Sequence, residues 1–329
     1  MKFATMATES GVLFAVSPDG SHIEPTEHID RIIEHNADAP WLWLHLDNNQ
    51  PATAEWLRAR GDLPEDIAES IIERHSRPRC TRWPGGLLFV GRGVNFDTDS
   101  RPEDMVSIRA WLTQDRLVTV VLRRVRAAED VAAEIKRGEP VGSPGEALVW
   151  LIGSLLDRMT PIIRETGEEI DDMLERIVEG KHEDARGELT PLRQRIVLLR
   201  RYAAPLRDAI SELHRAPHDL IPADVDAAVT ELVDRSTRLV EDLDAHNARA
   251  ELARQEIASI EAETLNRRLY GLAIISAIFL PLSFLTGLLG MNVPGIPVTT
   301  QPWAFWPWTG VFLLSLSVQL FILKKMRWL

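Results

Sequence analysis

The sequence Asn266-Arg-Arg-Leu-Tyr-Gly271, continued by Leu272-Ala-Ile-Ile-Ser-Ala-Ile-Phe-Leu-Pro-Leu-Ser-Phe-Leu-Thr-Gly-Leu-Leu-Gly-Met-Asn292, decides how this chain is organised. Within it, residues 269–291 are 23 consecutive uncharged positions, and residues 305–323 form a second uncharged stretch of 19. A helix needs about 20 apolar residues to cross the hydrocarbon core of a bilayer. Two such stretches so close together are not typical of buried helices in a soluble protein. The sequence therefore predicts two C-terminal transmembrane helices.

The charges beside these stretches predict their orientation. Arg267 and Arg268 precede the first span, and Lys324, Lys325 and Arg327 follow the second. The loop between the spans, residues 292–304, carries no charge. Lysine and arginine are enriched on the cytoplasmic side of membrane proteins. We therefore expect a multi-pass protein of the inner or plasma membrane, with both termini cytoplasmic and the loop outside.

The remaining residues, 1–268, carry all 49 acidic residues against 34 basic ones. This acidic balance argues against a nucleic-acid partner and permits attraction of cations, although it is also ordinary for an acidic soluble domain. The single cysteine, Cys80, rules out an intrachain disulfide. Phosphate-binding loops, dinucleotide fingerprints and nucleophile motifs are missing from the sequence, so we expect neither an enzyme nor an ATP-driven pump, and no cofactor.

Residues 1–142 are expected to form a cytoplasmic α/β domain. Apolar and β-branched runs at 41–46, 86–96, 107–112 and 117–122 predict strands.

Residues 143–268 are expected to be helical. Ser143, Pro144 and Glu146 are typical of a capped helix start. Further helices are predicted over 189–213 and from about 222 onward. The last of these lacks a breaker before Gly271, so it is either one stalk helix running into the first span or several shorter helices.

The first span and its end resemble the CorA superfamily of divalent cation transporters. The resemblance rests on residues 279–287, Phe-Leu-Pro-Leu-Ser-Phe-Leu-Thr-Gly, followed by Gly290-Met291-Asn292 at the outer end of the first of two spans. The order of parts also agrees, which implies a CorA-like funnel with a transmembrane domain over 269–329. Magnesium-type members follow the tripeptide with an acidic loop. Here the loop has no acid, and Gly295-Ile296-Pro297 is most similar to the zinc-transporting ZntB branch.

The resemblance implies a homopentamer whose first spans line a pore. It assigns a polar pore and selectivity set, a hydrophobic gate and a basic cytoplasmic ring. The pore and selectivity set is Gly290, Met291, Asn292, Ser283 and Asn266. The gate is Leu280, Leu272 and Leu269, and the basic ring is Lys324 and Lys325. Each residue also has a plainer interpretation. Asn292 suits a helix C-cap, Ser283 could bond to its own helix, the leucines could be ordinary helix surface, and the lysines could anchor the span.

Metal-binding residues in the cytoplasmic part form only weak sets. Three groups of such residues are close in sequence: Glu73, His75 and Cys80; His214, His218 and Asp219; and His182, Glu183 and Asp184. None has the spacing of a structural zinc motif. The acidic run Glu168, Glu169, Asp171 and Asp172 is more typical of a solvated helix face. A cytoplasmic metal site is therefore left open.

The sequence and the resemblance together predict transport of divalent cations, with Zn²⁺ as the expected ion and Mg²⁺, Co²⁺, Ni²⁺ and Cd²⁺ as further candidates. The expected partners are other copies of the chain, membrane lipid and the cations. A CorA-type Mg²⁺/Co²⁺ channel is the alternative within this class. A membrane-anchored sensor or scaffold is the alternative from another class. The direction of flow and its coupling to protons are not encoded in any motif.

Overall fold

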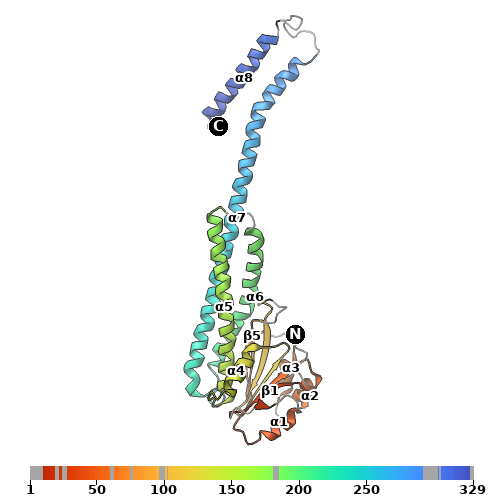
Figure 1. Ribbon diagram of the computed structural model, residues 1–329, viewed down its shortest axis with the longest axis vertical. Coiled ribbons are helices and arrows are strands. Elements are labelled where there is room, and N and C mark those ends of the chain that lie inside the picture. Colours follow the sequence, from red (N-terminus) through yellow and green to blue (C-terminus); the bar gives the residue numbers. More distant parts are fainter. Residues whose placement is uncertain are drawn as a thin grey trace. The chain divides into compact units, whose positions relative to one another are not determined.

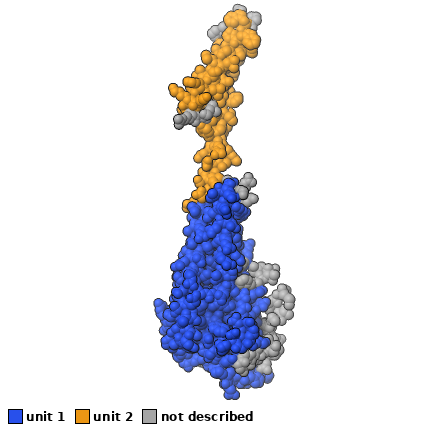
Figure 2. Space-filling model, turned by 60° about the vertical axis from the view of Figure 1, so that its left-hand side comes forward, with its two compact units in different colours: residues 1–254 blue, residues 255–329 orange. Residues whose placement is uncertain are grey.

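The computed structural model describes residues 10–18, 22–23, 28–59, 63–74, 77–95, 101, 103–180, 185–291, 303 and 305–326. The chain divides into two compact units, residues 1–254 and residues 255–329 (Figure 2). One helix, α7 (Asp226–Leu289), belongs to both units. The predicted domain limits at 142/143 and 268/269 remain predictions.

Seven strands of the first unit form one sheet, in the order β2-β1-β3-β7-β6-β5-β4. All neighbouring strands are antiparallel except β3 and β7, which are parallel. The strands are β1 (Val12–Val16), β2 (His22–Ile23), β3 (Leu42–Asp47), β4 (Arg79–Trp83), β5 (Gly86–Gly93), β6 (Val106–Leu112) and β7 (Arg116–Val121). The four strands expected from the sequence are thus β3, β5, β6 and β7.

One face of the sheet is covered by three short helices, α1 (Ile29–His35), α2 (Pro51–Ala59) and α3 (Glu65–Ile72) (Figure 1). They bury an apolar core against the strands. Its members include Ile32, Leu57 and Ile71 from the helices and Leu44, Val90, Trp111 and Val120 from the strands. Burial of apolar area on this scale is the main favourable term in folding.

A polar pair lies inside the sheet itself. His45 on β3 is buried, and its Nδ1 lies 2.7 Å from Oγ1 of Thr119 on β7. Thr119 Oγ1 also accepts a hydrogen bond from Trp43 Nε1 at 2.8 Å. Burial lowers the pKa of His45 to about 3, because the charged imidazolium would lose its hydration. His45 is therefore neutral at physiological pH.

The opposite face of the sheet receives α5 (Pro144–Val178), and α4 (Arg126–Lys136) packs against α5. Gly93 permits the close approach, since a Cβ at this position would lie 2.7 Å from Leu155 Cδ2. The start of α5 follows the sequence prediction. Ser143 Oγ accepts a hydrogen bond from Glu146 N at 3.0 Å, and the Glu146 carboxylate accepts one from Gly142 N at 2.7 Å. Two otherwise unpaired backbone donors are satisfied there.

Two further helices complete the first unit beside α5. They are α6 (Ala185–Leu213) and, after the 3-10 turn η2 (Ala223–Val225), the first part of α7 (Figure 1). Val229, Leu232, Leu239 and Leu243 of α7 recur at helical spacing and form a buried apolar stripe. Further along α7, Leu252 is 49% exposed, because the buried face has moved to Ala250 and Ala253.

The second unit contains the last part of α7 and α8 (Phe305–Lys325), which runs back in the opposite direction (Figure 1). α7 has 64 residues, so it is about 96 Å long at 1.5 Å per residue. It passes Gly271 and Pro281 without a break. The single stalk helix is thus the correct one of the two sequence alternatives. Both α7 and α8 contain windows long and apolar enough to cross a membrane.

Candidate functional site

The part of α7 that leaves the first unit is uncovered on every side. All ten residues from Glu261 to Tyr270 are exposed, including Leu265 and Leu269, which are 58% and 54% exposed. A soluble helix normally buries an apolar stripe against its own chain. Within the described residues, this part of α7 buries no such stripe against its own chain.

Beyond Gly271, α7 acquires one partly covered face. Its members recur every three or four residues and lie on one side of the helix. They are Gly271, Ile274, Ala277, Ile278, Pro281, Leu282, Leu285 and Leu289. α8 has a matching partly covered set that ends at the buried Leu323. We infer that these two faces are turned toward each other within the second unit.

The pore and gate residues expected from the sequence lie on the other side of α7. At 100° per residue, Asn266, Leu269, Leu272, Leu280 and Ser283 fall within an arc of about 120°. All five are exposed, and Leu280 is 70% exposed. We call this set the open arc. It turns two polar side chains and three leucines away from α8.

Ser283 differs from its hydroxyl-bearing neighbours on the helix. Thr286 Oγ1 donates to Ser283 O at 3.0 Å, and Ser276 Oγ donates to Leu272 O at 2.9 Å. Among the described residues, Ser283 Oγ has no such bond to its own helix. The plain interpretation of Ser283 as a back-bonding residue is therefore not supported, and its hydroxyl is available on the open arc.

The two ends of the membrane segments are less fully described. α7 ends at Leu289, and Gly290 and Met291 form a turn after it. Asn292 and most of the loop lie outside the described residues, so its predicted role is untested. At the other end, Lys324 and Lys325 occupy the last turn of α8 and are exposed. Cations at a helix C-terminus interact favourably with the helix dipole.

Comparison with known proteins agrees with this arrangement. The sequence model described as "CorA-like Mg2+ transporter protein" matches residues 38–325. The chain belongs to the CorA family. The prediction of this superfamily from the sequence is confirmed, as is the similarity to its ZntB branch.

Relatives of the chain cover nearly its whole length. The zinc transport proteins ZntB of Pectobacterium carotovorum and Yersinia pseudotuberculosis are 32% and 34% identical over 321 residues, which is 97% of both chains in each case. The divalent cation transporter CmaX of Pseudomonas aeruginosa is 33% identical over 291 residues, covering 88% of this chain and 87% of CmaX.

Solved structures give the same picture. Full-length CmaX superimposes with a TM-score of 0.82 at 30% identity, covering 98% of this chain and 99% of CmaX. The CorA magnesium transporter of Methanocaldococcus jannaschii gives 0.78 at 14% identity, covering 96% and 98%. The second of these likenesses concerns the fold alone. The predicted fold class, an α/β domain followed by long helices and two C-terminal membrane helices, is thereby confirmed.

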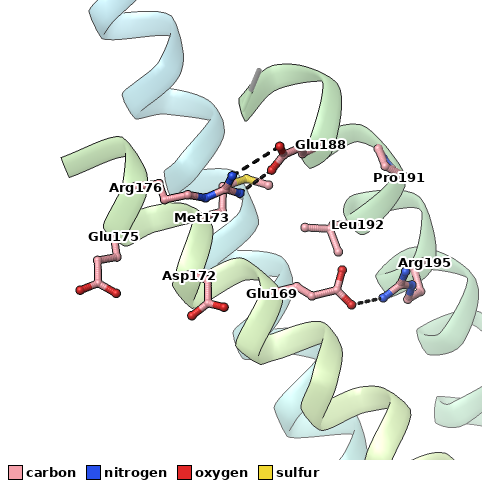
Figure 3. A pocket seen from close by; sticks show the side chains of 9 residues that line it. All are labelled: Glu169, Asp172, Met173, Glu175, Arg176, Glu188, Pro191, Leu192 and Arg195. Atoms are coloured by element: carbon pink, nitrogen blue, oxygen red, sulfur yellow. Dashed lines mark hydrogen bonds and ion pairs between the residues drawn. The ribbon is translucent and has the colours of Figure 1, made fainter. Parts of the chain in front are cut away.

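The first unit of the chain holds a cavity of about 630 Å³ between α5 and α6 (Figure 3). Four carboxylates are among its lining residues, which are Glu169, Asp172, Met173, Glu175, Arg176, Glu188, Pro191, Leu192 and Arg195. Two of the carboxylates are neutralised by ion pairs. Glu169 lies 2.7 Å from Arg195, and Glu188 pairs with Arg176. Asp172 and Glu175 point away from both pairs in Figure 3, so the four do not converge on one cation.

Three of the four carboxylates in the acidic run on α5 form ion pairs with arginines, Glu169 being one of them. Asp171 lies 2.8 Å from Arg249 on α7, and Glu168 lies 3.6 Å from Arg164 on its own helix. These contacts join helices of the bundle at its surface. The run is therefore a solvated, ion-paired helix face, as the sequence pattern indicated.

The weak metal sets do not assemble in the part of the chain that the structure describes. No group of three His, Cys, Asp or Glu side chains there is arranged to hold a metal. Burial raises the pKa of Cys80 to about 12, which keeps the thiol protonated and a poor ligand. His75, His182, Glu183 and Asp184 lie outside the described residues.

One open-arc position was missed by the sequence reasoning. Ser276 lies about 20° from both Leu269 and Ser283 around the helix. It was not among the pore residues assigned from the family resemblance. The spacing of seven residues on either side of Ser276 was the signal that could have found it.

Proposed function

We propose that this chain transports divalent cations, with Zn²⁺ as the preferred ion, across the inner or plasma membrane. The observation that carries the proposal is the open arc of α7. It presents Asn266, Ser283 and three leucines away from α8, on a helix of membrane-spanning length. Lipid-facing surface has no need of polar groups, because each unsatisfied polar group in hydrocarbon costs several kcal/mol.

The pore of this proposal is made by several copies of the chain. Two membrane helices cannot surround an aqueous path, so the open arcs of neighbouring copies must face one another. Family membership supports a homopentamer. Each open-arc residue then becomes a ring of five, and the exposed stretch 261–270 is covered by its equivalents.

The rings have distinct chemical tasks. Amide oxygens of Asn292 would hold a hydrated cation at the outer mouth, with Gly290 and Met291 shaping the turn that presents it. Side-chain oxygens bind weakly enough to release the ion again. Ser283 and Asn266 would offer further oxygens, and Leu280, Leu272 and Leu269 would close the path by expelling water. Lys324 and Lys325 would ring the cytoplasmic exit, with both termini on that side.

Zinc is preferred to magnesium for two reasons. The relatives named above as zinc transport proteins span 97% of this chain, and the outer loop 292–304 has no acid to concentrate strongly hydrated Mg²⁺. A Mg²⁺/Co²⁺ channel is the second candidate, favoured by the description of the matching family.

Uptake into proteoliposomes tests the proposal. The purified full-length chain would be reconstituted and offered Zn²⁺, Mg²⁺ or Co²⁺, with and without a pH gradient. We expect Zn²⁺ to enter fastest. Faster entry of Mg²⁺ than of Zn²⁺ would favour the Mg²⁺/Co²⁺ channel. If no ion enters faster than it enters empty liposomes, transport is excluded and the membrane-anchored sensor or scaffold is favoured.

A further inference from the structure

Four of the five open-arc residues belong to a longer repeat in α7. From residue 262 to residue 290, alternating steps of four and three residues connect Ala262, Asn266, Leu269, Ala273, Ser276, Leu280, Ser283, Gly287 and Gly290. A repeat of 3.5 residues keeps one helix face turned toward a common axis over several turns. Small and polar side chains occupy seven of these nine positions, whereas a lipid-facing stripe would be made of large apolar ones.

Ser276 lies near the middle of this repeat, and its side chain is exposed on the side away from α8. Its hydroxyl proton is already used, because Oγ donates to Leu272 O at 2.9 Å. Toward any further group, Oγ can therefore act only as a hydrogen-bond acceptor. An acceptor suits a cation or the hydrogens of its water shell, and does not suit an anion.

We propose that Ser276 is a further cation-contacting residue of the conduction path, forming a ring of hydroxyl oxygens that receives a hydrated divalent cation. This rests on the proposed function. The ring stands between the leucine positions Leu280 and Leu272. Without it, the path from Leu280 to Leu269 is an apolar run of about 16 Å. With it, the cation meets an oxygen ring about 10 Å below Ser283, so two short apolar barriers replace one long one.

The chain contains a matched control for Ser276. Ser317 in α8 is also exposed, and its Oγ donates to Leu313 O at 2.8 Å, so it has the same residue type and the same local bond. It lies 12 residues into α8, and Ser276 lies 13 residues before the end of α7. Because the two helices run in opposite directions, their depths in the membrane are similar. Only the helix differs.

The test compares leucine and cysteine substitutions at both serines in proteoliposomes. We expect Ser276→Leu to lower Zn²⁺ flux about tenfold or more by lengthening the dry segment, and Ser276→Ala to lower it about fivefold through loss of one hydrogen-bonding group per copy. Ser317→Leu should conduct as the wild type does. In a Cys80→Ser background, a small cationic thiol reagent added during flux should block Ser276→Cys and spare Ser317→Cys.

Two results would overturn the inference while leaving the proposed function intact. One is wild-type flux through Ser276→Leu, and the other is equal reactivity of the two cysteines in a protein that transports Zn²⁺. If the unsubstituted protein conducts no cation, the proposed function itself fails. Thiol reactivity then still reports whether Ser276 faces water, since it does not depend on transport.

Discussion

The two halves of α7 are built on opposite principles. Residues 226–254 pack into the bundle of the first unit, where Val229 and Leu243 are fully buried and Arg249 reaches Asp171 of α5. Residues 255–289 bury almost nothing against their own chain. The first half is therefore complete as one molecule. The second half leaves apolar surface exposed, and under the proposed function lipid and further copies of the chain cover that surface.

The largest effect expected from this contrast concerns three glycines. Gly167 of α5 lies against His246 of α7, and a Cβ there would be 2.7 Å from His246 Nε2. Gly167→Ala should lower the free energy of unfolding by about 1–3 kcal/mol through overpacking. Unfolding of the full chain in detergent, followed by circular dichroism, measures it.

Two matched glycines sharpen the comparison. Gly153, also on α5, has Leu232 Cδ2 at an ordinary 3.7 Å, so Gly153→Ala should raise stability by about 0.4–1 kcal/mol. Gly287, on the other half of α7, has nothing within 4 Å, and Gly287→Ala should leave bundle unfolding unchanged. A bundle that tolerates Gly167→Ala as well as Gly153→Ala would show that the α5–α7 contact is looser than described.

The next effect is a pH dependence confined to the first unit. The pKa of His45 in the folded chain is about 3, below its ordinary 6.5. Between these two pH values the unfolded chain therefore binds a proton at His45 that the folded chain does not bind. Stability should therefore be full above pH 6.5 and fall by about 1.4 kcal/mol per pH unit below it. Between pH 6.5 and pH 5 the loss is about 2 kcal/mol.

Denaturant titrations at several pH values measure this slope. His45→Gln removes the titrating group while keeping a polar partner for Thr119, so the slope between pH 6.5 and pH 5 should flatten. An unchanged slope would mean that some other group causes it.

The smallest effect concerns the ion pairs of the bundle surface. Arg249 and Asp171 are about half exposed, so water screens their attraction. Arg249→Met should cost no more than about 1 kcal/mol, and less at high salt. A loss of several kcal/mol in the same unfolding assay would mean that surface charge, and not the buried stripe, holds α7 in the bundle.

Much of this contrast could be predicted from the sequence. The cap formed by Ser143, Pro144 and Glu146, the unbroken α7 and the two spans all depend on local patterns, and the structure has them. Strand β4 (Arg79–Trp83) could not be predicted, because an edge strand half open to solvent has no apolar run. The parallel pairing of β3 with β7 joins segments about 70 residues apart, which no local signal encodes.

The candidate site also has features that the sequence predicts and features that it does not. The residue types of the open arc were visible in the sequence, and the structure adds that α8 turns to the opposite face. Ser276 was missed because its hydroxyl is ordinary in a helix until the covered face is known. The proposed rings would be formed by several chains, so a single chain indicates them only through the surface that it leaves exposed.

Zinc flux through Asn292→Ala tests the central claim most directly, since Asn292 would form the outer polar ring of the pore. The variant, the unsubstituted protein and Ser317→Ala would be reconstituted at equal density and their initial rates of Zn²⁺ uptake compared. The account predicts that uptake collapses in Asn292→Ala and is retained in Ser317→Ala. Unchanged uptake in Asn292→Ala would contradict it.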